Sequence, residues 1–254
     1  MSAQLATVNR TLRILEAFSY AEPVLGVSEI ARKVGMGKST VHRALTTLLD
    51  SGYVTKTSDD RYRLGWKLHE LGQLVVSGLR LHEVAHEPLE KLRRDCDLAV
   101  NLVVLDGTDA VYIKQFESAG LARNFRESGR RAPAHTTSSG KCLLAFADPQ
   151  VIDALIAAGL RGSGPRAITS ESALRSVLGS IRNDGFVVSV EERTRAVSSI
   201  GAPIFGRSGQ CIAAVSVVGP SLTMSGDGLD RYVRQVRTCA LRIGRAMGYT
   251  GIGR

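Results

Sequence analysis

Aromatic side chains are scarce in this sequence, since Phe, Trp and Tyr make up only 5% of its 254 residues. A surface that binds single-stranded nucleic acid by stacking bases on aromatic rings is therefore not expected. No apolar run reaches the roughly 20 residues that a membrane-spanning helix needs. The start of the chain also lacks the pattern of a signal peptide. The sequence thus predicts a cytoplasmic protein with no membrane partner.

Cysteine is also scarce, and no two of the four cysteines form a C-x-x-C pair. The four are Cys96, Cys142, Cys211 and Cys239. Three of them lie in apolar surroundings, which is typical of reduced core thiols in a cytoplasmic protein. We expect neither a metal nor a cofactor from this pattern.

Positive charge, in contrast, is in excess. The formal net charge is +9 and the sequence pI is about 9.7, which favours a polyanionic partner. Residues 1–67 carry 10 basic and 6 acidic residues, a net of +4, and residues 68–254 carry 23 and 18, a net of +5. Because both parts share the excess, charge alone does not locate the partner's binding site.

Residues 27–49 have the pattern of two short amphipathic helices joined by a glycine turn at residues 35–37. Ser28 can cap the first helix. In the second helix the apolar residues follow an i, i+3, i+4, i+7, i+8 pattern and predict one buried face. The opposite face carries residues that can donate to phosphates and base edges: Lys38, Ser39, Thr40, His42, Arg43, Thr46 and Thr47. This pattern predicts a helix-turn-helix whose second helix enters the DNA major groove.

The flanking residues extend this prediction to a winged helix-turn-helix. A further amphipathic helix is expected over residues 5–18, and two strands over residues 53–56 and 61–64, joined by a turn. In this wing, Lys56, Arg61 and Arg63 are placed to touch the DNA backbone or minor groove, and Ser28 joins the DNA-contacting set. The alternative is a small helical domain with a solvated basic face.

Three short motifs suggest other chemistry but lack parts that it requires. The Gly-Lys-Ser-Thr run at residues 37–40 lacks the first glycine of a phosphate-binding loop and follows a helix instead of a strand. Residues 82–86 match the zinc-protease pattern H-E-x-x-H, but Pro88 disturbs the helix that both histidines need. Around His135, Ser139 and Cys142 a nucleophile with a histidine base is conceivable, yet the spacing suggests no acid partner.

Beyond the wing, residues 66–81 predict a linker helix with an apolar face, available either for a partner subunit or for its own domain. Helices are then expected over residues 82–96, 140–147, 149–158, 170–184 and 226–248. Strands are expected over residues 97–105, 110–117, 185–192, 199–205 and 211–219. Turns such as Asp106–Asp109 join consecutive strands, so the sheet should be mainly antiparallel. The predicted class is α+β, with domains at residues 1–65 and 82–254.

With these features the whole chain resembles the IclR-type bacterial transcription regulators. Besides the winged helix, the resemblance rests on three segments: residues 134–145 (AHTTSSGKCLLA), residues 185–205 with Gly-Phe, Glu-Glu and SIGAPIF, and residues 213–220 (AAVSVVGP). It implies a GAF-like carboxy-terminal domain that binds a small-molecule effector. Carried over by motif, the pocket would be formed by Ser138, Ser139, Gly140, Ser189, Glu191, Val197, Ser199, Ser216 and Val218. Small hydroxyl residues before Gly-Lys at a helix start can also seat a carboxylate, or they can simply cap the helix.

The predicted function is therefore a ligand-responsive, sequence-specific DNA-binding regulator, not an enzyme. We expect a repressor of a metabolic or catabolic operon that senses a small organic acid or an aromatic metabolite. It would bind a palindromic operator in double-stranded DNA as a homodimer or a dimer of dimers. The alternatives are a metabolite-processing enzyme with an accessory DNA-binding module, and a nucleoid-type protein without sequence preference.

Overall fold

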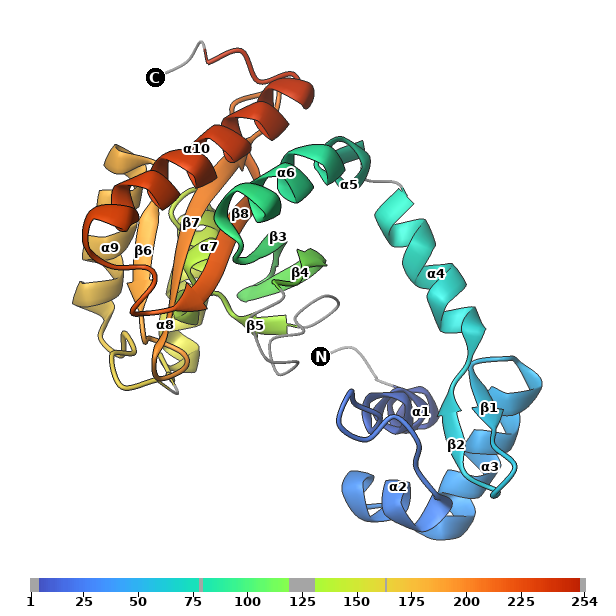
Figure 1. Ribbon diagram of the computed structural model, residues 1–254. Coiled ribbons are helices and arrows are strands. Elements are labelled where there is room, and N and C mark those ends of the chain that lie inside the picture. Colours follow the sequence, from blue (N-terminus) through green and yellow to red (C-terminus); the bar gives the residue numbers. More distant parts are fainter. Residues whose placement is uncertain (1–4, 78–79, 119–130, 163, 252–254) are drawn as a thin grey trace. The chain divides into compact units, whose positions relative to one another are not determined.

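The computed structural model describes residues 5–77, 80–118, 131–162 and 164–251. The chain divides into an amino-terminal unit, Met1–Gly78, and a carboxy-terminal unit, Leu79–Arg254. The boundary follows the linker helix α4 (Trp66–Ser77), which falls in the first unit (Figure 1).

The amino-terminal unit is a winged helix-turn-helix, as the sequence predicted. Its elements are α1 (Ala6–Glu16), α2 (Val27–Val34), α3 (Lys38–Asp50), β1 (Val54–Lys56) and β2 (Tyr62–Leu64). The two strands pair antiparallel, and the apolar side of α3 faces a core shared with α1 and α2. Gly35 ends α2 with a φ of 67°, in the left-handed region that favours glycine, and so allows the sharp turn into α3.

The helix expected over residues 5–18 is present as α1, which begins and ends just inside that range. The predicted cap at Ser28, in contrast, was wrong. Helix α2 is capped by Gly26 and not by Ser28, because the carboxylate of Glu29 accepts a hydrogen bond of 2.7 Å from the Gly26 N–H. Ser28 is the second residue of this helix, and its side chain is exposed.

The carboxy-terminal unit is built on one antiparallel sheet with the strand order β5-β4-β3-β8-β7-β6. The strands are β3 (Ala99–Asp106), β4 (Asp109–Phe116), β5 (Arg131–Pro133), β6 (Val187–Val190), β7 (Val197–Phe205) and β8 (Cys211–Pro220). The antiparallel arrangement and the tight turn after Asp106 were predicted. The three-residue edge strand β5 was not, because so short a segment has no alternating pattern.

Helices cover both faces of this sheet (Figure 1). One face packs against α6 (His86–Cys96) and α10 (Leu229–Ala246) through an apolar core, with the short α5 (Arg80–Val84) at its edge. The other face is partly covered by α7 (Ser138–Leu144), behind which lie α8 (Pro149–Ala158) and α9 (Glu171–Asp184). Because α7 is short, it leaves part of this second face without an apolar cover.

Several helix bounds differ from the prediction for physical reasons. The expected helix over residues 82–96 is two helices that meet at Ala85, and Pro88 stands in the first turn of the second, where a missing N–H is tolerated. Helix α7 begins at Ser138 instead of Gly140, with Thr137 as its cap. The closing helix is preceded by a short 3-10 turn, Gly226–Gly228.

Candidate functional sites

The recognition helix α3 presents its polar side to solvent. Its buried residues are Val41, Leu45 and Leu48. The seven polar residues predicted to contact DNA are all exposed: Lys38, Ser39, Thr40, His42, Arg43, Thr46 and Thr47. The hydroxyls of the two last threonines donate to the backbone carbonyls of His42 and Arg43 at 3.0 and 3.2 Å. An exposed helix face rich in donors and acceptors suits the readout of base edges.

The wing residues have more varied surroundings. Lys56 is exposed and pairs with Asp60 at 2.6 Å, an interaction that raises the pKa of the lysine. Arg63 is also exposed, and its Nε donates to the Thr55 hydroxyl at 3.1 Å. Both side chains lie on exposed parts of the hairpin, as a backbone contact would require.

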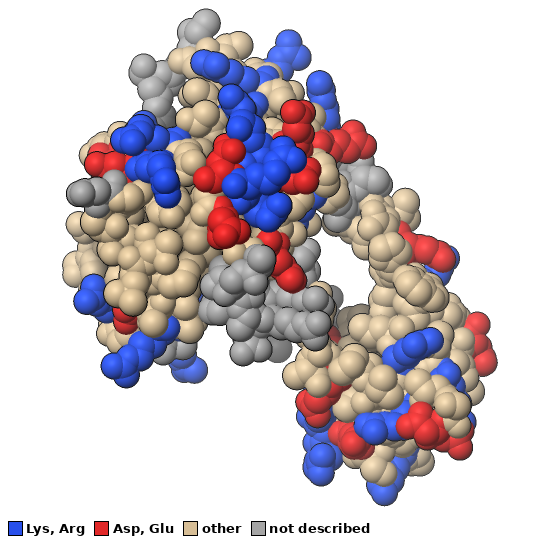
Figure 2. Space-filling model, in the orientation of Figure 1, with Lys and Arg blue, Asp and Glu red and all other residues tan. Residues whose placement is uncertain are grey.

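Arg61, in contrast, makes its contacts inside the amino-terminal unit. Its Nη2 donates to Glu29 Oε2 at 2.7 Å and to the carbonyl of Val24 at 3.0 Å. The Gly26 N–H and this guanidinium hold the pKa of the Glu29 carboxyl below its ordinary value. Arg61 therefore joins the wing to the start of α2, a structural role that the sequence did not indicate. Over the face shown in Figure 2, basic and acidic side chains are interspersed on both units.

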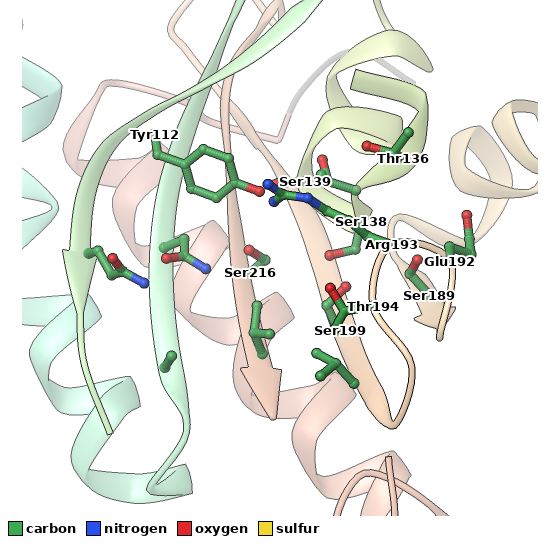
Figure 3. A pocket seen from close by; sticks show the side chains of 16 residues that line it. Tyr112, Thr136, Ser138, Ser139, Ser189, Glu192, Arg193, Thr194, Ser199 and Ser216 are labelled. Carbon is green, nitrogen blue, oxygen red and sulfur yellow. The ribbon is translucent and has the colours of Figure 1, made fainter. Parts of the chain in front are cut away.

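The uncovered part of the second sheet face holds a cavity of about 370 Å³ (Figure 3). Its floor follows the register of the strands: Ala99, Val218, Ser199 and Ser189 form one row across four strands, and Asn101 and Ser216 belong to the next row. Alternate residues of a strand point to the same face, which is why these positions share the cavity. The neighbouring Ala213, Val215 and Val217 of β8 point to the apolar core on the other face.

Seven of the nine residues predicted for a pocket line this cavity. They are Ser138, Ser139, Ser189, Val197, Ser199, Ser216 and Val218. Nine further lining residues were missed: Ala99, Asn101, Tyr112, Gln115, Thr136, Thr137, Glu192, Arg193 and Thr194. Of these nine, only Asn101 could have been suspected from the sequence, because it places an amide between apolar residues of a strand.

Gly140 and Glu191, which were also predicted for the pocket, do not line this cavity. Gly140 packs onto the preceding turn, where an added Cβ would lie 2.2 Å from the carbonyl oxygen of Ala134, and its N–H is bound by the Thr137 hydroxyl. Glu191 has a φ of 54° in the left-handed region, which breaks the alternation of β6. As a result Glu192, one residue later, takes the place predicted for Glu191.

The lining residue Glu192 forms a buried ion pair with Lys141, which does not itself line the cavity. Lys141 Nζ donates to Glu192 Oε1 and lies 3.4 Å from the Ser189 hydroxyl. The two side chains are only 1% and 9% exposed. Burial lowers the pKa of Lys141, against the opposing effect of the Glu192 carboxylate. The carboxylate is therefore held in place by one buried cation.

Three buried polar atoms around this cavity have no hydrogen-bond partner among the described residues. They are Asn101 Oδ1, Ser139 Oγ and Glu192 Oε2. An unsatisfied buried polar atom costs on the order of 1–3 kcal/mol. All three atoms belong to residues that line this cavity, a composition that favours a polar ligand.

The rejected motifs gain no support from the geometry. Cys142 is fully buried, which raises the pKa of its thiol well above the ordinary value, and the Ser139 hydroxyl makes no hydrogen bond to His135. Such a thiol is a poor nucleophile. His82 and His86 stand in separate helices, and no group of three or more possible metal ligands occurs in the described part of the chain. Within the described residues no helix is long and apolar enough to cross a membrane.

Both units match family models of bacterial regulators. Residues 7–58 match the IclR helix-turn-helix domain, and residues 73–245 match the bacterial transcriptional regulator IclR C-terminal domain. The chain is 32% identical over 246 residues to the HTH-type transcriptional regulator KipR of Bacillus subtilis, covering 96% of this chain and 98% of KipR. It is 34% identical over 246 residues to the regulator KdgR of Escherichia coli, covering 96% and 93% of the two chains.

Solved structures agree over nearly the full length. An IclR homologue from Microbacterium hydrocarbonoxydans, crystallised in complex with 4-hydroxybenzoate, superposes with a TM-score of 0.85 at 27% identity. That match covers 95% of this chain and 99% of the other. The Thermotoga maritima IclR superposes with a TM-score of 0.79 at 28% identity, covering 97% and 100%.

Proposed function

Because this chain belongs to the IclR family of bacterial transcriptional regulators, we propose that it represses a metabolic or catabolic operon and releases it on binding a small organic acid or aromatic metabolite. That it is a DNA-binding regulator follows from the family. The observation that carries the effector part is the cavity with three unsatisfied buried polar atoms, Asn101 Oδ1, Ser139 Oγ and Glu192 Oε2. The 4-hydroxybenzoate held by a structural relative supports the proposed size and class of the ligand.

In this proposal α3 is the recognition helix that contacts the operator. The proposed mechanism places Arg43 and its exposed neighbours on α3 in the major groove, with Lys56 and Arg63 of the wing on the backbone. Effector binding then favours an arrangement of the amino-terminal units with lower operator affinity. By linkage, operator DNA must lower the affinity for the effector by the same factor.

A palindromic operator requires at least two copies of the chain. Exposed apolar side chains at the start of α1 and on α4 support self-association, above all Leu5, which precedes α1 and is 73% exposed, and Trp66, which is 76% exposed. We therefore propose a homodimer or a dimer of dimers. Sedimentation of the purified chain at several concentrations measures this directly, and a monomer at operator-saturating concentrations would contradict it.

The DNA-binding part is tested with the full chain and a pool of randomised duplexes. Repeated selection should enrich one inverted-repeat sequence, and Arg43→Ala should then weaken binding to that duplex by about 1–3 kcal/mol at fixed salt. Arg175→Ala is the matched control, because it removes the same charge from α9, far along the chain from α3. Binding without enrichment would indicate a nucleoid-type protein instead.

The regulatory part is tested on the enriched duplex. Addition of organic acids should lower operator affinity for at least one compound, and a reporter placed behind that operator should be repressed by the chain and relieved by the same compound. Activation of the reporter would overturn the assignment as a repressor. Turnover of a compound by a chain lacking residues 1–65 would favour the enzyme alternative.

A further inference from the structure

The unsatisfied atoms of the cavity restrict the chemistry of its ligand. A carboxylate oxygen and an amide oxygen only accept hydrogen bonds, whereas a hydroxyl can accept or donate. Glu192 Oε2 and Asn101 Oδ1 are therefore acceptors that lack a donor, and both are buried. A ligand that satisfies them must bring hydrogen-bond donors to these positions.

The charge at Glu192 excludes a second anionic group beside it. One of its carboxylate oxygens is bound by Lys141, so this buried cation is already paired. A ligand carboxylate placed against the remaining oxygen would meet like charge in a poorly solvated site. A neutral hydroxyl donating to Oε2 would instead form a charge-assisted hydrogen bond, roughly twice as strong as a neutral one.

A different part of the lining suits an anion. Figure 3 shows the Arg193 side chain reaching across the cavity towards Tyr112 and Ser139, while Glu192 lies beside Ser189 at the opposite end of the view. A guanidinium has five N–H donors and can bind a carboxylate in addition to its other contacts. The cavity thus has a cationic part at Arg193 and an acceptor part at Glu192.

We propose that the effector is a hydroxylated carboxylic acid whose carboxylate faces Arg193 and whose hydroxyl donates to Glu192. This inference rests on the proposed function and narrows its ligand class. Glu192 is then the residue that selects for the hydroxyl group, and Lys141 is a positioning residue that fixes the carboxylate. The cavity of about 370 Å³ fits a compound of one ring or a short chain.

Matched pairs of acids test the proposal on the full chain. The pairs are 4-hydroxybenzoate with benzoate, 3-hydroxybutyrate with butyrate, and lactate with propionate, each measured by isothermal titration. In the pair that fits best, the hydroxylated member should bind at least about tenfold more tightly, because its absence leaves Glu192 without a donor. Operator release, measured by fluorescence anisotropy, should follow the same order.

Variants separate the hydroxyl contact from general damage to the cavity. Glu192→Gln should reduce the preference for the hydroxylated member, and the double variant Lys141→Met/Glu192→Leu should abolish it while the plain acid still binds. Glu191→Gln is the control, because it removes a charge next in the chain but outside the lining, and it should keep the full preference.

The outcomes distinguish this inference from the function on which it rests. If both members of every pair bind alike and still release operator DNA, the hydroxyl assignment is overturned while the regulator with an organic-acid effector stands. If the preference persists in the double variant, Glu192 is not the selecting residue. If no acid binds and none changes operator affinity, the effector class itself fails, although sequence-specific operator binding would remain measurable.

Discussion

Removal of Glu192 alone should destabilise the carboxy-terminal unit strongly, because it leaves the Lys141 ammonium buried without a counter-charge. Lys141 is 1% exposed, and its Nζ also lies 3.4 Å from the Ser189 hydroxyl, which carries no charge. Breaking a buried ion pair on one side costs about 3–5 kcal/mol. The lysine can escape this cost by losing its proton.

Deprotonation sets an upper limit to the effect. A lysine with an unfolded pKa of about 10.4 that is held neutral at about pH 7 costs about 1.36 kcal/mol for each of about 3.4 pH units, or about 4.6 kcal/mol. Burial already lowers the pKa of Lys141 in the intact pair, so loss of the carboxylate should complete the shift. We therefore expect Glu192→Leu to lower the free energy of unfolding by about 3–4.6 kcal/mol.

Urea unfolding followed by circular dichroism measures this change, and hydrogen exchange locates it. Peptides from α7 and β6 should lose protection, whereas peptides from α3 should not. The double variant Lys141→Met/Glu192→Leu should recover to within about 1 kcal/mol of the parent chain, because it removes both charges at similar volume. A single variant as stable as the parent, or a double variant as unstable as the single one, would refute the reasoning.

Three further predictions concern the wing, a buried histidine and a close helix–strand contact. Lys56→Ala should weaken binding to all DNA sequences similarly and reduce the dependence of affinity on salt by about one phosphate contact, and a loss confined to one sequence would contradict this role. Burial lowers the pKa of His135, which lies near Lys141 and Glu192, so the unfolded chain binds this proton first as the pH falls below 6.5. Stability from this group is present above 6.5 and is lost on acidification; His135→Asn should therefore flatten the fall in melting temperature between about pH 7.5 and about pH 5.5. Gly201→Ala would place a Cβ 2.8 Å from the backbone of α7, so it should lower the melting temperature and weaken ligand binding together; an unchanged titration would show that α7 moves freely.

The amino-terminal unit was predictable because its signals are local. The apolar stripe of α3 and the glycine turn before it are periodic features within about 20 residues, and they specify both the buried and the exposed face. The role of Arg61 was not predictable in this way, because its partner Glu29 lies 32 positions earlier. No periodic pattern encodes a contact of that kind.

The pocket was predictable only in part. The family resemblance and strand alternation indicated the serine positions, which share a sheet face. The left-handed φ of Glu191 is a property of a non-glycine residue in a turn, where sequence gives no reliable sign. A shift of one residue there means that Glu192, and not the predicted Glu191, lines the cavity. The ion pair of Glu192 with Lys141 joins positions 51 residues apart, so no local pattern indicates it.

The cavity is a built feature of the sheet and not a packing defect. On β8 the residues facing α10 are apolar and fully packed, whereas Ser216 on the other face is small and opens to the cavity. The absence of a side chain at Gly201 lets α7 lie directly on β7 and close one wall, while the wall itself carries the unsatisfied Ser139 hydroxyl. Interiors otherwise pack densely and pair their polar atoms, so the unsatisfied polar atoms of this cavity lower the stability of the carboxy-terminal unit until a partner satisfies them. A ligand that fills the space and supplies the missing donors stabilises the folded unit by RT ln(1 + [L]/Kd). It shifts operator affinity only by the difference between its affinities for the operator-bound and the operator-free arrangement.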